Sequence, residues 1–199
     1  MALLPIWVRN MENGRRIKER LRQEVLAERK QLSESEWQNR SRLITHQVIV
    51  HPAFLSARKI FLFVNAKGET DTRQIMEAAW IAGKIVAVPR VNRKVMNFFR
   101  IDNINQLEPG SFGIYEPVRD REAVEPDDAD TLMIMPGVVF DIKRHRIGYG
   151  GGYYDKYLSE HPQPAKTMAV AFALQVKNEI PFEPHDIRPD ILITEGNLL

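Results

Sequence analysis

The sequence predicts an α/β fold with a mainly parallel sheet, and three observations carry that prediction. Continuous apolar runs typical of buried strands alternate along the chain with segments of helical periodicity. A length of 199 residues suits one compact domain with a sizeable core. Hydrophobic residues make up 44% of the chain and charged residues 27%, an ordinary globular composition that argues against disorder over the whole chain.

Two helices are expected before the first strand. Segment 15–31 has apolar residues at helical spacing on one face and basic residues on the other. Ser33 and Glu36 then form an S-x-x-E capping box, which predicts the start of a second helix. That helix should end before Pro52, because a proline disfavours helical geometry in the residue before it.

The rest of the chain alternates strands with helices. Thr70 or Asp71 is the expected N-cap of the third helix, and Gly83 its C-terminal stop. Segment 102–130 is rich in loops, and segment 136–152 reads as one long loop. The expected strands are 60–64, 85–88 (ended by Pro89), 95–99, 131–135, 167–172 and 190–193, and the remaining helices are 71–82 and 154–160.

Composition and charge exclude several classes of protein. The chain has no cysteine, which excludes disulfides, thiolate metal sites and cysteine nucleophiles. No apolar run approaches the ~18 residues of a membrane span, so we expect a cytoplasmic protein with no membrane partner. The net charge is only +2, since the basic segment 9–30 is offset by the acidic segment 116–130. This balance argues against a dedicated nucleic-acid-binding protein.

Segment 140–155 is the strongest candidate for a functional site. Four of the five residues 148–152 are glycine, which lets the backbone approach a ligand and point N–H groups at it. A helix N-terminus follows, and Arg146 adds a positive charge. These features predict a phosphate site, with a flexible turn as the alternative. The segment fits neither the G-x-G-x-x-G nor the Walker fingerprint.

Charged residues elsewhere suit the same chemistry. Asp155 is expected either to hold Mg²⁺ or to cap a helix, and Asp186 either to supply a second carboxylate or to be a loop acid. Lys18 and Arg22 share one helical face, where like charges repel unless a polyphosphate binds; otherwise they form a solvated basic face.

Two further charged residues lie near the ends of predicted strands. Glu69 and Arg90 are each either ligand-binding or surface residues. Other chemistries find little support, because the histidines lack zinc-ligand spacing and Gly110 to Gly113 is not a G-x-S-x-G elbow.

The segment 140–155 resembles the signature of the 5-formyltetrahydrofolate cyclo-ligase family, F-D-x-x-G-x-R-[LI]-G-x-G-x-G-[YF]-Y-D. About a dozen of its sixteen positions agree. The family usually has glycine where this chain has Arg144, so a positive φ there would strain the turn. Further similar segments, in the family's order over roughly residues 15–195, are 18–22, 68–72, 88–90, 110–117, 135–137 and 185–186.

The resemblance implies a Rossmann-like, single-domain α/β fold over residues 15–199, and we expect residues 1–14 to be a poorly ordered extension. It implies ATP-dependent, Mg²⁺-dependent conversion of 5-formyltetrahydrofolate to 5,10-methenyltetrahydrofolate, with release of ADP and phosphate. The formyl oxygen would attack the γ-phosphoryl group, and N10 would then displace phosphate. Such chemistry needs positioning and charge neutralisation rather than a covalent nucleophile.

The same resemblance implies a role for each matched residue. Arg146 and Tyr153 would be catalytic, and Asp155 and Asp186 would hold the metal. ATP would be bound by Lys18, Arg22, Arg146, Ile147, Gly148, Tyr149, Gly150, Gly151, Gly152, Tyr153 and Tyr154. The folate substrate, possibly carrying a polyglutamate tail, would be bound by Val64, Glu69, Arg90, Phe112, Tyr149, Gly150, Gly151, Gly152 and Tyr153.

Two alternatives remain at this point. One is another phosphate-ligand enzyme on a similar scaffold, of the sugar-phosphate isomerase or CoA transferase type, since a fold does not fix a function. The other is a nucleic-acid-binding module that uses the basic N-terminal helix. We expect a monomer that acts on a small molecule.

Overall fold

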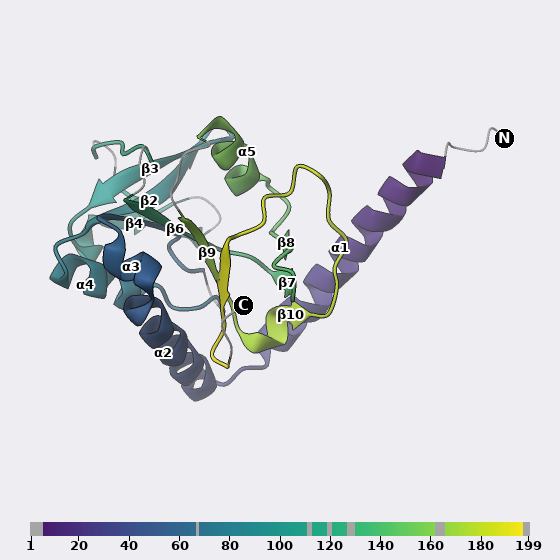
Figure 1. Ribbon diagram of the computed structural model, residues 1–199, viewed down its shortest axis with the longest axis horizontal. Coiled ribbons are helices and arrows are strands. Elements are labelled where there is room, and N and C mark those ends of the chain that lie inside the picture. Colours follow the sequence, from purple (N-terminus) through teal and green to yellow (C-terminus); the bar gives the residue numbers. More distant parts are fainter. Residues whose placement is uncertain are drawn as a thin grey trace.

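The computed structural model describes residues 6–66, 68–110, 113–118, 121–126, 130–161 and 166–196. Its main sheet has six strands, β1 (Lys59–Leu62), β2 (Ile85–Asn92), β3 (Val95–Ile101), β6 (Thr131–Met135), β9 (Lys166–Val170) and β11 (Ile191–Ile193). The strand order is β11-β9-β6-β1-β2-β3, and every neighbouring pair is parallel except β2 with β3. Figure 1 labels β9, β6, β2 and β3 of this sheet. The predicted α/β class with a mainly parallel sheet is confirmed.

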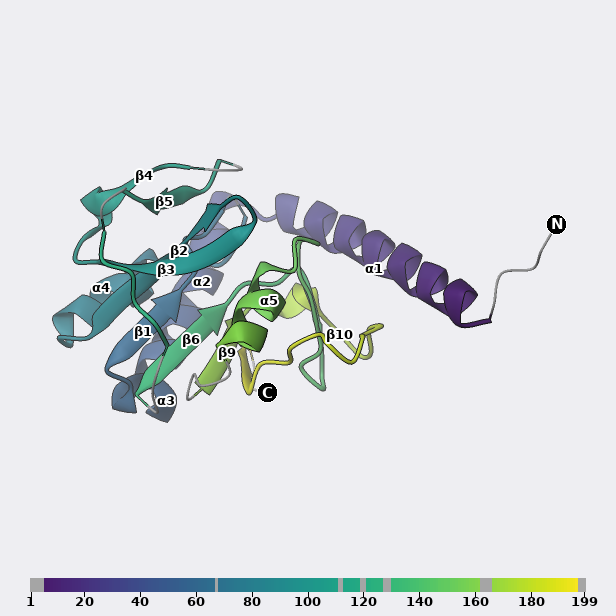
Figure 2. The ribbon, with the colours of Figure 1, turned by 90° about the horizontal axis from the view of Figure 1, so that it is seen from above.

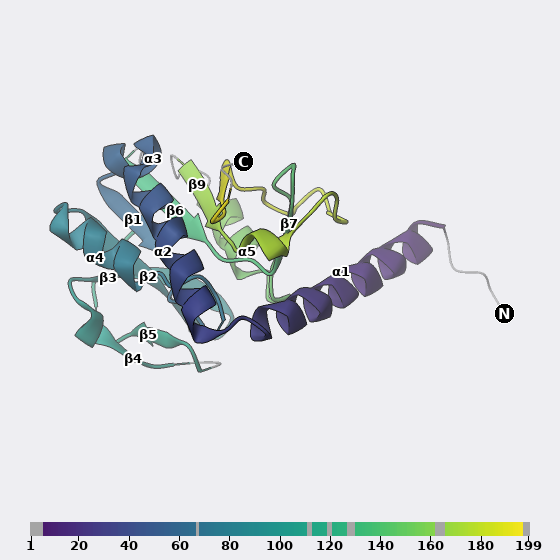
Figure 3. The ribbon, with the colours of Figure 1, turned by 90° about the horizontal axis from the view of Figure 1, so that it is seen from below.

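Helices cover both faces of this sheet (Figures 2 and 3). One face packs against α2 (Glu34–Val50) and α4 (Arg73–Ile81), and the other against α5 (Tyr153–Glu160). The short α3 (Pro52–Ser56) connects α2 to β1. Because both faces are covered, β6 is buried at all five positions, as its continuous apolar sequence predicts.

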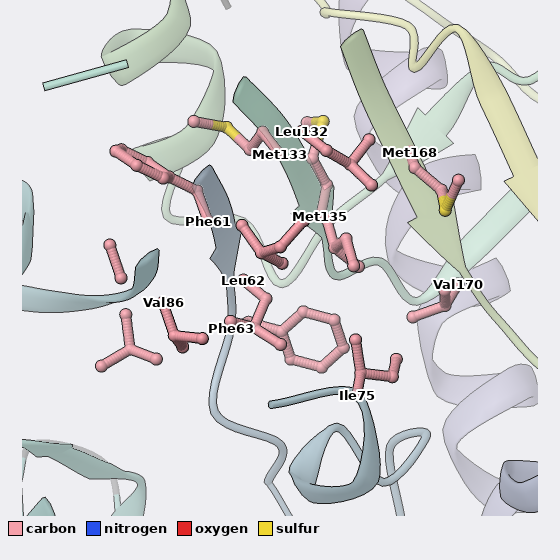
Figure 4. Close-up of a cluster of buried hydrophobic side chains, with 14 of the residues drawn as sticks. Phe61, Leu62, Phe63, Ile75, Val86, Leu132, Met133, Met135, Met168 and Val170 are labelled. Carbon is pink, nitrogen blue, oxygen red and sulfur yellow. The ribbon is translucent and has the colours of Figure 1, made fainter. Parts of the chain in front are cut away.

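The core gathers side chains from the central strands and the helices that cover them. Phe61 of β1 lies beside Met133 of β6 in the register of the sheet, and Figure 4 shows both in the cluster. The Phe98 ring of β3 lies 4.9 Å from the Phe61 ring and 5.1 Å from the Tyr157 ring, measured between centroids. These aromatic contacts fix α5 against the sheet, and with it the loop that precedes α5.

The helix α1 (Ile6–Lys30) is longer than the sequence predicts. It begins at Ile6 rather than at residue 15, because Gly14 lowers helix propensity by only about 1 kcal/mol and does not end the helix. Its first half projects from the body of the molecule (Figure 1), whereas Val25 is fully buried. Residues 1–5 of the expected extension lie outside the described residues.

Three smaller predictions are wrong. β2 continues through Pro89, because β1 pairs only as far as Ala87 and β2 then has β3 as its one neighbour in the described sheet. The N-cap of α4 is Thr72, not Thr70 or Asp71. The expected long loop 136–152 contains two short strands, β7 (Val139–Asp141) and β8 (Arg146–Ile147).

The remaining elements are short. A hairpin of β4 (Leu107–Pro109) and β5 (Tyr115–Pro117) follows the 3₁₀ turn η1 (Ile104–Gln106). The 3₁₀ turn η3 (Ala173–Gln175) leads into β10 (Val176–Lys177), which pairs with β7 in a three-stranded sheet. Among the described helices, none combines the length and apolar character needed to cross a bilayer.

Candidate active site

A cavity of about 1010 Å³ lies where the parallel strands of the main sheet end. Phe63 and Val64, which follow β1, and Pro136, which follows β6, form part of its wall. Ligands of α/β sheets bind at this edge, so the position agrees with the sequence prediction. The wall also includes Arg15, Lys18, Arg22, Glu69, Met96, Ile114, Tyr115, Glu116, every residue from Arg146 to Lys156, Glu183, His185 and Asp186.

The glycine-rich segment 148–152 crosses this cavity and ends at α5. Gly152 is the N-cap of α5 with φ +63°, and Gly150 has φ +98°, conformations that side chains other than glycine rarely adopt. A Cβ atom at Gly151 would lie 2.6 Å from the Tyr153 ring. Glycine is therefore required at these positions for steric reasons, and its lack of a side chain lets the backbone form the cavity wall. Because Gly152 caps the helix, the alternative that Asp155 is the cap is wrong.

Arg146 is the most deeply buried cation of the cavity, with a side chain only 5% exposed. Its Nη2 donates to Asp155 Oδ1 at 2.8 Å, and its Nη1 donates to the Pro136 carbonyl at 3.3 Å. Its Nε is buried and finds no hydrogen-bond acceptor among the described residues. An unpaired buried N–H of this kind costs about 1–3 kcal/mol.

Lys18 and Asp186 meet at the end of the cavity that faces α1. Lys18 Nζ lies 2.7 Å from Asp186 Oδ2 and 3.5 Å from Glu183 Oε1. Burial opposes ionisation of Asp186, but hydrogen bonds from Lys18 and from the Glu183 N–H hold the pKa of this carboxyl below its usual value. The Ile187 N–H donates to Asp155 Oδ1 at 3.0 Å, which connects the two predicted metal ligands through one residue.

Glu183 and His185 also lie at the cavity, although the sequence predicts no metal-binding role for either. One ligand atom from each, together with one from Asp186, lies within 4.8 Å of the others. The adjacency of Glu183, His185 and Asp186 in a short segment was the available signal. The histidine spacing does not match a zinc site, and the similarity to the family covers only residues 185–186 of the three.

Arg22 holds the glycine loop from α1. Its Nε donates to the Gly148 carbonyl at 2.7 Å, and its Nη1 donates to Glu19 at 2.8 Å. The Gly148 carbonyl is therefore hydrogen-bonded to α1. The structure therefore brings Arg22 next to the loop, and both line the cavity.

Glu69 lies deep in the cavity wall and is 6% exposed. Burial raises the pKa of this carboxyl above its usual value, although hydrogen bonds from Tyr149 and the Ala66 N–H act in the opposite direction. The Tyr149 hydroxyl donates to Oε1 at 2.7 Å and the Ala66 N–H donates to Oε2 at 2.7 Å. These two donors therefore stabilise the ionised form of the Glu69 carboxyl against the effect of burial.

The remaining predicted residues divide into those that line the cavity and those that do not. Val64, Tyr153 and Tyr154 line the cavity, and the buried Tyr154 hydroxyl has no partner among the described residues. Arg90 is not part of the wall, because its Nη1 donates to the Pro117 carbonyl and its Nη2 pairs with Glu108 at 2.6 Å. Phe112 lies outside the described residues.

Arg144 adopts a left-handed backbone conformation, at the position where the family signature usually has glycine. Its φ is +68°, and its Nε donates to the Pro189 carbonyl at 3.3 Å. For a residue other than glycine or asparagine this conformation costs on the order of 1–2 kcal/mol. The strain lies in the turn between β7 and β8, and β8 carries Arg146.

Arg144→Gly is therefore expected to raise the free energy of unfolding by about 0.5–1 kcal/mol, since relief of strain exceeds the entropy cost of glycine. Chemical denaturation monitored by circular dichroism measures this change. Arg144→Ala is the matched control, because it loses the contact with Pro189 and keeps the strain. A stability loss in Arg144→Gly as large as in Arg144→Ala would contradict the argument.

The comparisons with known proteins agree with this geometry. The profile of the 5-formyltetrahydrofolate cyclo-ligase family matches residues 15–195. The chain belongs to this family. The 5-formyltetrahydrofolate cyclo-ligase of Mus musculus is 32% identical over 190 residues, which cover 89% of this chain and 93% of the mouse protein. That of Escherichia coli K12 is 29% identical over 180 residues, covering 85% and 96%.

A solved structure supports the same assignment. The 5,10-methenyltetrahydrofolate synthetase of Aquifex aeolicus superimposes with a TM-score of 0.80 at 33% identity, covering 92% of this chain and 91% of that one. The Rossmann-like α/β fold and the family resemblance are confirmed, and the protein is a ligase. The family assignment decides against the isomerase and CoA transferase alternatives.

Proposed function

We propose that this protein catalyses the ATP- and Mg²⁺-dependent cyclisation of 5-formyltetrahydrofolate to 5,10-methenyltetrahydrofolate, with release of ADP and phosphate. The observation that carries the proposal is the Arg146 guanidinium, a cation only 5% exposed that lines the cavity beside the glycine backbone. A cation buried in this way, next to a helix N-terminus, suits the charge of a transferring phosphoryl group.

The reaction balances as two displacements. The formyl oxygen forms a bond to the γ-phosphorus while the bond from that phosphorus to the β–γ bridging oxygen breaks, and ADP leaves. N10 of the folate then forms a bond to the formyl carbon, loses its proton, and the carbon–oxygen bond breaks with loss of phosphate. Neither step needs a protein nucleophile, so positioning and electrostatic stabilisation account for the catalysis.

The α1 side of the cavity is the proposed nucleotide side. Lys18 and Arg22 project from one face of α1, four residues apart, and both line the cavity. The two like charges repel each other by a few tenths of a kcal/mol, and a polyphosphate reverses that sign. The backbone from Gly148 to Gly152 and the N-terminus of α5 contribute N–H groups for the terminal phosphates.

Asp155 and Asp186 would hold Mg²⁺, and the donor set fits this ion. Magnesium prefers one or two carboxylates together with phosphate oxygens and water. Asp186 has its pKa held below the usual range, so it is ionised at neutral pH. When bound, Mg²⁺ supplies charge neutralisation to the phosphate chain. Arg146 and Lys18, which pair with the two carboxylates, hold them in place beside the cavity.

The proposed folate side of the cavity is the part lined by Phe63, Glu69, Met96 and Ile114. Phe63, Met96 and Ile114 give it an apolar wall that suits an aromatic ring. The Glu69 carboxylate can accept hydrogen bonds from the N–H groups of the pterin. Tyr153 and Phe112 would pack on the ring, and Arg90 would act from outside the cavity wall through its neighbour Glu116.

The test follows the near-ultraviolet absorption of the methenyl product. Purified protein is mixed with 5-formyltetrahydrofolate and Mg²⁺, with and without ATP, and with EDTA added in a third sample. Growth of the band only where ATP and free Mg²⁺ are both present is expected, with equimolar release of phosphate. No growth in the complete mixture, from protein that binds ATP by calorimetry, would move the substrate to another class.

Lys18→Ala is expected to raise the KM for ATP about tenfold and to leave the KM for the folate within about twofold, because an ion contact to phosphate is lost. Initial rates at varied ATP and at varied folate separate the two constants. Arg20→Ala is the matched control, because Arg20 is a 68% exposed side chain on α1 that does not line the cavity. An unchanged KM for ATP in Lys18→Ala would remove Lys18 from the nucleotide site.

A further inference from the structure

A chain of hydrogen bonds connects α1 to the folate side of the cavity. Arg29, near the end of α1, is 4% exposed, and its Nη1 donates to the Tyr149 hydroxyl oxygen at 3.1 Å. That hydroxyl in turn donates to Glu69 Oε1 at 2.7 Å. These hydrogen bonds join three separate segments of the sequence. Of the three residues, Glu69 and Tyr149 line the cavity and Arg29 does not.

Arg29 also fixes the segment that carries Glu69. Its Nε donates to the Gly68 carbonyl at 2.7 Å, one residue before Glu69. The Trp37 indole N–H donates to the Glu69 carbonyl at 2.7 Å. The backbone of Glu69 is therefore held from α1 and α2, while its side chain is held by Tyr149 and the Ala66 N–H.

Tyr149 itself is held although its ring is half exposed. The residue is 52% exposed, but its hydroxyl oxygen lies between Arg29 and Glu69. The residue before it, Gly148, accepts a hydrogen bond from Arg22. α1 thus contacts two consecutive residues of the glycine loop, which fixes the direction of the Tyr149 side chain.

We propose that Arg29 and Tyr149 are positioning residues that hold the Glu69 carboxylate, in its ionised form, toward adjacent N–H donors of the bound pterin. This inference rests on the function proposed above and assigns a role to Arg29, which does not touch the cavity. Tyr149 connects the two other residues, because its hydroxyl accepts a hydrogen bond from Arg29 and donates one to Glu69. A carboxylate that is already held in one orientation loses less conformational entropy on binding a planar ligand with two N–H donors than a freely rotating one, so the ligand binds more tightly.

The charges around Glu69 act in a direction that agrees with this role. Burial raises the pKa of Glu69, and the hydrogen bond from Tyr149, the N–H of Ala66 and the charge of Arg29 each lower it. From α5, Tyr154 faces Glu69, and burial keeps the pKa of this phenol far above its usual value, so it stays neutral. Loss of the Tyr149 hydroxyl therefore raises the pKa of Glu69 further.

Tyr149→Phe tests the inference, since it removes one oxygen from a half-exposed ring. We expect the Kd of 5-formyltetrahydrofolate, measured by calorimetry without ATP, and the KM for this substrate to rise about tenfold. The KM for ATP and kcat at saturation should stay within about twofold. The acid limb of kcat/KM should move to higher pH, because a carboxyl with a higher pKa is protonated earlier as the pH falls.

Two further variants make the test specific. Tyr157→Phe is the matched control, because it removes a buried phenol oxygen that has no described partner and lies outside the cavity wall; it should match the parent in every constant. In a Glu69→Gln background, Tyr149→Phe should change the folate Kd less than twofold, since the partner of the hydroxyl has lost its charge.

The outcomes separate the inference from the proposed function. A parent that forms methenyl product, combined with an unchanged folate Kd and pH profile in Tyr149→Phe, would overturn the positioning role alone. A tenfold change in Tyr149→Phe that persists in the Glu69→Gln background would also overturn it, because the effect would not act through Glu69. A parent that neither binds nor converts 5-formyltetrahydrofolate would overturn the proposed function, and this inference with it.

Discussion

Arg146→Ala is expected to lower kcat about a thousandfold with 5-formyltetrahydrofolate and ATP. Arg146 lines the cavity with a guanidinium that is only 5% exposed, so its charge acts on a bound phosphoryl group with little screening by water. A preorganised donor that meets charge developing in the transition state contributes about 10²–10³ to the rate, and a buried arginine on a phosphoryl group somewhat more. Steady-state initial rates at saturating substrates measure the loss.

Two variants separate this effect from a loss of folding. Arg146→Lys keeps a positive charge but loses the planar donors, so its kcat should lie between those of the parent and Arg146→Ala. Arg40→Ala removes another arginine, which pairs with Glu195 at 2.8 Å outside the cavity, and should keep the parent's kcat. A kcat within tenfold of the parent in Arg146→Ala would contradict the catalytic role of Arg146.

The parts of the fold that follow from local patterning were predictable from the sequence. The capping box of Ser33 and Glu36 is formed as expected, and α2 begins at Glu34. β6 occupies Thr131–Met135 as predicted, because a strand covered on both faces is rich in apolar residues rather than alternating. Such signals lie within one segment of the chain, so they do not depend on tertiary contacts.

The errors in the fold have tertiary causes. A proline interrupts a strand that is paired on both sides, because it has no N–H to donate. At Pro89, however, β2 no longer pairs with β1, so the strand can continue. The strands β7 and β8 are too short to show a pattern, and β7 is held in part by β10, a strand from far along the sequence. The pairing of β7 with β10 could not be inferred from the residues of one segment.

The candidate site shows the same division. The glycines of the loop and Arg146 were recognisable, because their chemistry is local and their spacing matches the family signature. The partners of these residues were not. Arg29 and Tyr149 are 120 residues apart. The helical spacing places Arg29 four residues after Val25, on the buried face of α1, but it does not indicate which residue Arg29 contacts. Only the fold brings it to Glu69.

Asp155→Asn is expected to reduce kcat at least about a hundredfold and to weaken the dependence of the rate on Mg²⁺. Asp155 Oδ1 accepts hydrogen bonds from Arg146 Nη2 and from the Ile187 N–H. The amide oxygen of asparagine can accept both, so the local structure should be kept while the negative charge is lost. The loss therefore reports on the charge that the proposed Mg²⁺ site and Arg146 require.

Titration of the rate with Mg²⁺ decides between the proposed metal role of Asp155 and a structural one. In Asp155→Asn the Mg²⁺ concentration for half-maximal rate should rise at least about tenfold. Asp190→Asn is the matched control: its Oδ2 accepts from the Thr167 N–H and hydroxyl at 2.9 Å, and it lies outside the cavity wall. It should keep the parent's kcat and Mg²⁺ dependence. If Asp155→Asn lowers thermal stability as its main effect and leaves the Mg²⁺ titration unchanged, Asp155 serves to orient Arg146 and Ile187, and Asp186 would have to bind the metal without it.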